Sequence, residues 1–213
     1  MSKTATAAPP TAGASAGATT AYRGSDKLLL GIVLAVVTFW LFAGTVGTIA
    51  PEILRSINSE TERVTAQQMN LGVSITALFS GLLIVVMGGL ADRIGRVRIT
   101  LVGLGAGILG SLLVVLASGA AALPLLLGGR AIQGFSAACI MPATMALVKT
   151  YWDGPGRQRA VSMWSIGSWG GSGLAAVFGG AMATSIGWRW IFISSIVVSV
   201  IAVVLILGTP ESK

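Results

Sequence analysis

The chain has 213 residues, of which 54% are hydrophobic and 10% are charged, and its mean hydropathy is +0.86. Soluble domains carry about 25% charged residues, so this composition excludes an ordinary globular enzyme and a disordered chain. The sequence has no His and one Cys, which excludes a His/Cys metal site, a disulfide framework and His-dependent nucleophile sets. The net charge of +7 does not predict nucleic-acid binding, because the basic residues are dispersed among apolar runs. We expect an integral membrane protein that is not an enzyme, with no metal and no cofactor.

Residues 1–27 are rich in Ala, Thr, Gly, Ser and Pro and lack an apolar run. This composition predicts a disordered tail rather than a signal peptide. Six apolar runs follow, each near the length of about 20 residues that crosses a bilayer. Backbone groups in lipid must be satisfied within the segment, so each run is predicted to be a helix. The fold class is therefore all-α, with a six-helix transmembrane domain at 28–209 and a short end at 210–213. The predicted spans are about 28–50, 67–91, 99–118, 122–149, 160–184 and 188–209.

The basic residues predict how the bundle lies in the membrane. Ten Lys and Arg residues fall in the tails and loops of one side, three fall on the other side, and Arg130 lies inside a run. Basic residues collect on the cytoplasmic side of a membrane, so both termini are predicted to be cytoplasmic. The acids nearest to the spans are Glu52 and Asp92, each at a predicted helix end.

The loop between the second and third spans carries an acid beside three arginines, with glycines on both sides. Such a cluster at a membrane surface can act as a latch, because its ion pairs form in one conformation and break in another. The alternative is plain positive-inside charge, which leaves the Asp and the glycines unexplained. The run G-x-L-A-D-R-x-G-R-x-R resembles the cytoplasmic loop motif of the major facilitator superfamily, with Val97 in one basic slot. The resemblance implies a gating loop formed by Gly88, Asp92, Arg93, Gly95, Arg96 and Arg98.

The fourth span contains Arg130 well inside its apolar run. An intramembrane Arg is expensive and marks a functional site by default, although a snorkelling Arg is the alternative. Gln133 and Gly134 follow at helical spacing. The segment resembles the fourth-helix motif of the same superfamily, which implies that Arg130 takes part in proton coupling inside a cavity.

The fifth span has small residues at every fourth position, and such a stripe permits close helix contact. The segment resembles the fifth-helix motif of drug antiporters, but Ala175 and Ala176 replace its Gly-Pro pair, so we expect no kink there. By the superfamily's architecture, this stripe and the Asp92 cluster are expected to find their main partners in a second half. The packing residues are Gly167, Gly171, Ala175, Gly179 and Gly180.

Further residues are candidates for a cavity. Trp40, Phe42, Trp164 and Trp169 could line a cavity and stack on a planar drug, or face lipid or a neighbouring helix instead. An Arg130 guanidinium would bind a carboxylate, which favours hydrophobic substrates that are anionic or zwitterionic. First spans in many related pumps carry an acid in a D-x-T element, whereas this chain has Ala43-Gly44-Thr45, and Glu52 is the nearest carboxylate.

The sequence around the fifth span resembles the fourteen-span drug:proton antiporter subfamily, which includes quinolone and multidrug efflux pumps. Major facilitator transporters have two six-helix halves, each an inverted 3+3 repeat, and this chain resembles the first half. The resemblance implies proton-coupled drug efflux across the bacterial cell membrane, driven by the proton-motive force because no ATP-binding loop occurs. Three readings stay open: an N-terminal half or truncated form, a short homodimeric transporter, and a non-transporting membrane subunit or inactive remnant. The partners implied are a small molecule, lipid, and a second half or second copy.

Overall fold

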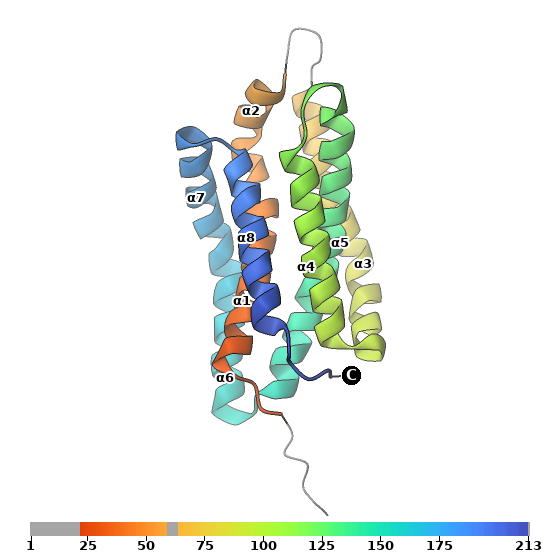
Figure 1. The fold of residues 1–213 in the computed structure, drawn as a ribbon, viewed down its shortest axis with the longest axis vertical. Helices are drawn as coiled ribbons and strands as arrows, with labels where there is room; N and C mark the ends of the chain where they lie inside the picture. The colour runs from red at the N-terminus through yellow and green to blue at the C-terminus, as the bar shows by residue number, and fades with distance from the viewer. Residues whose placement is uncertain (1–21, 59–63, 213) are drawn as a thin grey trace, which may run out of the picture.

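The computed structural model describes residues 22–58 and 64–212, and these residues form a helical bundle (Figure 1). Residues 1–21 of the predicted tail at 1–27 lie outside the described residues. The last two residues of the tail, 26 and 27, are the first two residues of α1. The all-α fold class is confirmed. The elements are α1 Asp26–Ala43, α2 Val46–Ile57, α3 Ala66–Ile94, α4 Arg96–Val115, η1 Gly119–Ala121, α5 Ala122–Tyr151, α6 Gly154–Ser165, η2 Ile166–Gly170, α7 Gly171–Ser185 and α8 Arg189–Ile206.

Within the described residues, five helical segments are long and apolar enough to cross a membrane: α1, α3, α4, η1 with α5, and α8. Helices α6, η2 and α7 follow one another without a gap from residue 154 to residue 185 and together run alongside these segments as one interrupted helix. The described ends of the chain, near residues 22 and 212, lie at the same end of the bundle (Figure 1). We call this the terminal end, and the end that carries α2 the opposite end.

The first predicted span, 28–50, is two helices rather than one. The Thr45 hydroxyl donates to the Leu41 carbonyl at 2.7 Å, the oxygen that the Thr45 amide would use in a continuous helix. A side chain that competes in this way, next to Gly44, weakens the helix locally. The chain restarts as α2 and stays helical to Ile57, beyond the predicted end at residue 50.

The fifth predicted span is also interrupted. The missing Pro predicted an unkinked helix, but η2 is a π-helical turn of five residues that separates α6 from α7. A π turn accommodates one more residue per turn than an α-helix, and Gly167, Gly170 and Gly171 reduce the cost of leaving α geometry.

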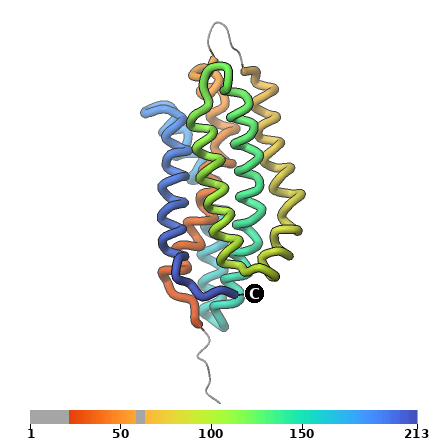
Figure 2. Tube along the Cα trace, turned by 45° about the vertical axis from the view of Figure 1, so that its right-hand side comes forward, coloured from red at the N-terminus to blue at the C-terminus, as the bar shows by residue number. Residues whose placement is uncertain are grey.

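The helices form a layered bundle in which α5 is central. It packs along α4 on one side and α3 on the other, while α1 packs along α8 and α8 along α4. Figure 2 shows α3 at one edge of the bundle. The interface between α4 and α5 depends on glycine: a Cβ at Gly103 would lie 2.8 Å from the Cβ of Cys139, and one at Gly129 would lie 2.7 Å from the Gly110 carbonyl oxygen. Ser136 crosses the same interface and donates to the Gly103 carbonyl at 2.7 Å.

The small-residue stripe of the fifth span packs inside this chain, which differs from the expected contact with a second half. A Cβ at Gly171 would lie 2.8 Å from Trp40, and one at Gly179 would lie 2.6 Å from Thr45. Gly167 faces Val33 in the same way, and Ala175 is buried. The stripe is therefore the surface that seats α7 and η2 on the first span. Gly180 lies off the stripe, because an added Cβ would meet no described atom within 4 Å.

Candidate functional site

Arg130 is the centre of a buried polar network that joins three helices. Its side chain projects from α5 and the residue is 2% exposed. The Nη1 group donates to the Phe42 carbonyl of α1 and to Oε1 of Gln133 at 2.8 Å. Gln133 in turn donates to the Ser111 hydroxyl of α4 at 3.2 Å. A charge held among neutral acceptors in an apolar bundle is costly, so this network is a candidate functional feature.

The backbone beside Arg130 is held by α3. The Thr76 hydroxyl donates to the Arg130 carbonyl at 2.9 Å. Close approach of the two helices needs small residues: a Cβ at Gly134 would lie 2.6 Å from the Thr76 carbonyl oxygen, and one at Gly72 would lie 3.4 Å from the Arg130 side chain. Gly134 therefore acts in the contact between α3 and α5.

A cavity of about 420 Å³ lies between α1 and α3, with Arg130 in its wall. Phe39 and Trp40 form an edge-to-face pair at one side, with ring centroids 5.0 Å apart. The Arg130 Nε has no hydrogen-bond partner among the described residues. The cavity therefore combines aromatic surface, hydroxyl groups and a buried cation. Its lining residues are Phe39, Trp40, Ala43, Gly44, Val73, Thr76, Ala77, Ser80, Gly81 and Arg130.

The predicted cavity residues do not form one group. Gln133 of α5 accepts from Arg130 and donates to Ser111 of α4. Trp164 is half-buried on α6 and donates to the Thr144 hydroxyl at 3.0 Å, while Trp169 on the π turn is 75% exposed on the outside of the bundle. Glu52 lies on α2, where its carboxylate pairs with Arg55 at 3.4 Å. Of these residues, the structure brings Gln133 together with Arg130 and keeps Trp164, Trp169 and Glu52 apart from it.

Trp40 is one of the aromatic residues that the sequence suggests for a cavity wall, and it lies in this one. Phe42 does not line the cavity, although its carbonyl accepts from Arg130. Phe39 and the α3 hydroxyls are cavity residues that sequence reasoning missed. The hydroxyls of Thr76 and Ser80 gave no signal, because their place in the cavity depends on how α3 crosses α5.

The loop between α3 and α4 is a single residue, Gly95, with a φ of 131° that favours glycine. Asp92 accepts from Arg96 at 2.8 Å, and Arg96 also donates to the Thr150 hydroxyl at the end of α5. Arg93 is exposed. Gly88 lies inside α3, where an added Cβ would be 3.5 Å from Pro142.

Glu211 completes this loop, and no motif in the sequence indicates this. Its carboxylate accepts from the Val97 amide at 2.8 Å and from the Arg98 amide at 3.1 Å, and lies 3.8 Å from the Arg98 side chain. An acid at this position accepts hydrogen bonds from free amides at the start of α4, and its negative charge interacts favourably with the positive end of the helix dipole. The loop cluster, defined as Asp92, Arg96, Arg98, Thr150 and Glu211, thus joins α3, α4, α5 and the segment after α8.

Comparison with known proteins agrees with this geometry. A family profile described as Major Facilitator Superfamily matches residues 28–213. The chain is 55% identical over 194 residues to the quinolone resistance protein NorB of Staphylococcus aureus strains JH9 and Newman, covering 91% of this chain and 40% of NorB. The chain thus spans less than half the length of these relatives.

Two solved structures share the fold. The inward-open xylose transporter XylE from E. coli is 15% identical, with a TM-score of 0.65 over 87% of this chain and 47% of XylE. A peptide transporter POT in complex with alafosfalin is 18% identical, with a TM-score of 0.68 over 89% of this chain and 40% of that one.

Proposed function

Because the chain belongs to the major facilitator superfamily, we propose that it is the N-terminal half, or a truncated form, of a drug efflux transporter in the cell membrane. The similarity to NorB supports a substrate of the quinolone or multidrug type. In this proposal the proton-motive force drives transport, and the chain binds no cofactor.

The observation that carries the proposal is Arg130 in the wall of the 420 Å³ cavity. In a low-dielectric site a guanidinium repels a cation and binds a carboxylate, to which it donates paired N–H groups. The Phe39–Trp40 pair offers aromatic surface for a planar ring system. The ligand that fits this cavity is therefore hydrophobic, planar and either anionic or zwitterionic.

The proposed orientation places the terminal end in the cytoplasm. Arg93, Arg96, Arg98, Lys149 and Arg159 all lie at this end, and basic residues favour the cytoplasmic side. The loop cluster then faces the cytoplasm. Its Asp92–Arg96 and Arg98–Glu211 contacts are ion pairs that a conformational change could break and reform.

A homodimeric transporter is the second candidate, and the exposed side of α3 favours a partner of some kind. Leu78, Leu82 and Val85 share one side of α3, and Val85 is 80% exposed. Another six-helix half or a second copy could cover this surface. A non-transporting subunit is the third reading, and it predicts no energy-dependent flux.

The test is efflux of a fluorescent quinolone and of ethidium from cells that make only residues 1–213. The variants are Arg130→Ala and, as a matched control, Arg55→Ala at an exposed arginine of the opposite end. If the chain transports as an oligomer, a protonophore and Arg130→Ala both abolish quinolone efflux, whereas Arg55→Ala does not.

Absence of efflux with confirmed membrane insertion would exclude the active homodimer. The same assay is then repeated with the remaining part of a NorB-like transporter supplied as a second chain. Recovered efflux that depends on Arg130 supports the half-transporter, and no efflux in this arrangement favours the non-transporting subunit.

A further inference from the structure

Arg130 carries a buried charge that no acid among the described residues neutralises. The described residues include five acids, and each pairs with an arginine other than Arg130. A guanidinium keeps its proton in proteins, so burial does not remove the charge. A buried charge in an apolar bundle is costly unless an opposite charge lies beside it. The five pairs are Asp26–Arg159, Glu52–Arg55, Asp92–Arg96, Asp153–Arg157 and Glu211–Arg98.

The neutral partners of Arg130 compensate part of this charge. Its Nη1 group donates to the carbonyl of Phe42, which lies in the last turn of α1. The carbonyls of a last turn form the negative end of the helix dipole, equivalent to about half an elementary charge. The second acceptor, Oε1 of Gln133, belongs to a neutral amide. The described residues therefore leave part of the positive charge uncompensated.

One edge of the guanidinium is free to bind an anion. Both hydrogen bonds that the Arg130 side chain donates to described residues come from Nη1. The group is planar, and Nε and Nη2 form a second edge that binds an anion through two parallel N–H groups. Nε is buried and has no acceptor among the described residues. Buried N–H groups are nearly always paired in folded proteins, so this edge indicates an acceptor that the described residues do not supply.

The cavity between α1 and α3 has room for such an acceptor. Its volume is about 420 Å³, with Arg130 in its wall, and a small inorganic anion needs the space of a water molecule, about 30 Å³. Arg130 also lines a second hollow, together with Val46, Met69 and Phe192, which has no room for a water molecule. Of these two hollows, the cavity is therefore the one that can take an ion.

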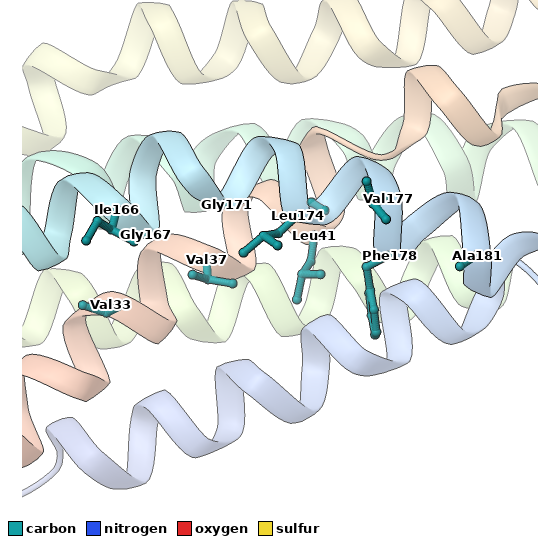
Figure 3. A pocket seen from close by; sticks show the side chains of 11 residues that line it. Val33, Val37, Leu41, Ile166, Gly167, Gly171, Leu174, Val177, Phe178 and Ala181 are labelled. Atoms are coloured by element: carbon teal, nitrogen blue, oxygen red, sulfur yellow. The ribbon is translucent and has the colours of Figure 1, made fainter.

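A larger groove on the same helix differs from the cavity in its chemistry. It has a volume of about 510 Å³ and lies between α1 and the α7 segment. Figure 3 shows Leu41, Leu174 and Phe178 along this groove, and its lining residues are apolar side chains and glycines alone. The groove therefore offers an anion no side-chain donor, whereas the cavity offers the free edge of Arg130.

We propose that the 420 Å³ cavity binds a small inorganic anion of the size of chloride, held by the Nε–Nη2 edge of Arg130. The anion supplies the negative charge that the described acids do not. In the proposed function the carboxylate of a substrate binds the same guanidinium, so the substrate displaces the anion. That displacement rests on the proposed function, whereas the anion site itself requires no transport.

Chloride is the probe, and chlorine NMR tests the site, because chloride that exchanges with a protein site has a broader line than free chloride. The sample is the 213-residue chain in phosphatidylcholine nanodiscs, with protein-free nanodiscs as the baseline. The wild-type chain adds a linewidth that disappears as chloride saturates the site. Arg130→Gln loses most of this added linewidth. Ala77→Trp, which fills the cavity from an exposed position of α3 and keeps Arg130, loses most of it too.

Two matched variants serve as controls. Arg55→Gln removes an exposed arginine, and Leu78→Trp adds an indole next to Ala77, at an exposed position that does not line the cavity. Both keep the wild-type linewidth. A wild-type chain with no saturable linewidth would overturn the proposal. A folded Arg130→Gln variant that keeps the wild-type linewidth would overturn it as well, and if that variant does not fold, Ala77→Trp decides in the same way.

A planar carboxylate separates this proposal from the proposed function. Naphthoate removes the added chloride linewidth if both anions bind Arg130. Saturable chloride binding that naphthoate does not displace would support the anion site and contradict a carboxylate-bearing substrate. Quinolone efflux by a chain without saturable chloride binding would support the transporter and overturn the anion site.

Discussion

At the scale of single residues, the bundle is organised around one buried cation. Arg130 binds a carbonyl of α1 and an amide oxygen of its own helix, while a hydroxyl of α3 binds its carbonyl. These contacts fix how α1, α3 and α5 meet. Arg130, a candidate functional residue from the sequence, therefore also holds these helices together. Substitutions of the residues that contact it should lower the stability of the bundle.

Thr76→Val tests the link from α3. The substitution keeps the shape of the side chain but removes the hydrogen bond to Arg130. We expect the free energy of unfolding in detergent to fall by about 0.6 to 1 kcal/mol. Thr184→Val is the control, since the Thr184 hydroxyl bonds only within its own helix in the structure. Equal loss in the two variants would argue against a special role for the contact with Arg130.

Gly134→Ala tests the close approach of α3 and α5. An added methyl would lie 2.6 Å from the Thr76 carbonyl oxygen, so the helices must separate, at a cost of about 1 to 3 kcal/mol. Gly128→Ala on the same helix meets no described atom within 4 Å and should gain up to about 1 kcal/mol from helix propensity. Thermal unfolding followed by tryptophan fluorescence distinguishes the two, and an opposite order would refute the packing.

At the scale of elements, the seating of α7 on the first span depends on the stripe. A matched pair of neighbouring glycines tests it: Gly179 faces Thr45 at 2.6 Å and Gly180 faces no described atom within 4 Å. Gly179→Ala should destabilise the bundle by about 1 to 3 kcal/mol, and Gly180→Ala should not. Detergent unfolding of the two variants gives the comparison. Similar values would mean that α7 does not rest on this face.

The start of α4 is an element-scale contact that spans almost the whole chain. Glu211→Ala should raise the hydrogen-exchange rates of the Val97 and Arg98 amides, because both lose their acceptor. Asp153→Ala removes an acid at the same end that pairs, among the described residues, with Arg157 alone and should leave those two amides unchanged. Unaltered exchange in Glu211→Ala would show that the carboxylate is dispensable as a cap.

At the scale of the whole molecule, the exposed apolar side of α3 is a surface that lipid covers unless the proposed second half packs on it. We expect a thiol at this surface, Val85→Cys in a Cys139→Ser background, to lose reactivity towards a lipid-soluble maleimide when the remaining transporter half is supplied. Leu109→Cys on α4 should stay reactive under the same conditions. Unchanged labelling of Val85→Cys would place the partner elsewhere.

The sequence predicted the helical class and the burial of Arg130, because hydropathy and the cost of an intramembrane charge are local properties. It could not place Trp169 or Glu52, since a helix exterior and a cavity wall have similar compositions in a membrane protein. The sequence identified the residues of the small-residue stripe but not the helix that they contact. Their spacing shows that one face of the helix has small side chains, but it does not show which helix packs on that face. Glu211 and Val97 are 114 residues apart, so their contact exists only in the folded bundle.

That last contact has a consequence for biosynthesis. Helix α4 leaves the ribosome long before Glu211 is translated, so its first amides have no carboxylate until α8 and the segment after it have been synthesised. Closure of the loop cluster therefore reports that the bundle has been fully synthesised. A nascent chain arrested before residue 211 would present an open loop at the membrane surface, a difference that a membrane-bound protease could recognise.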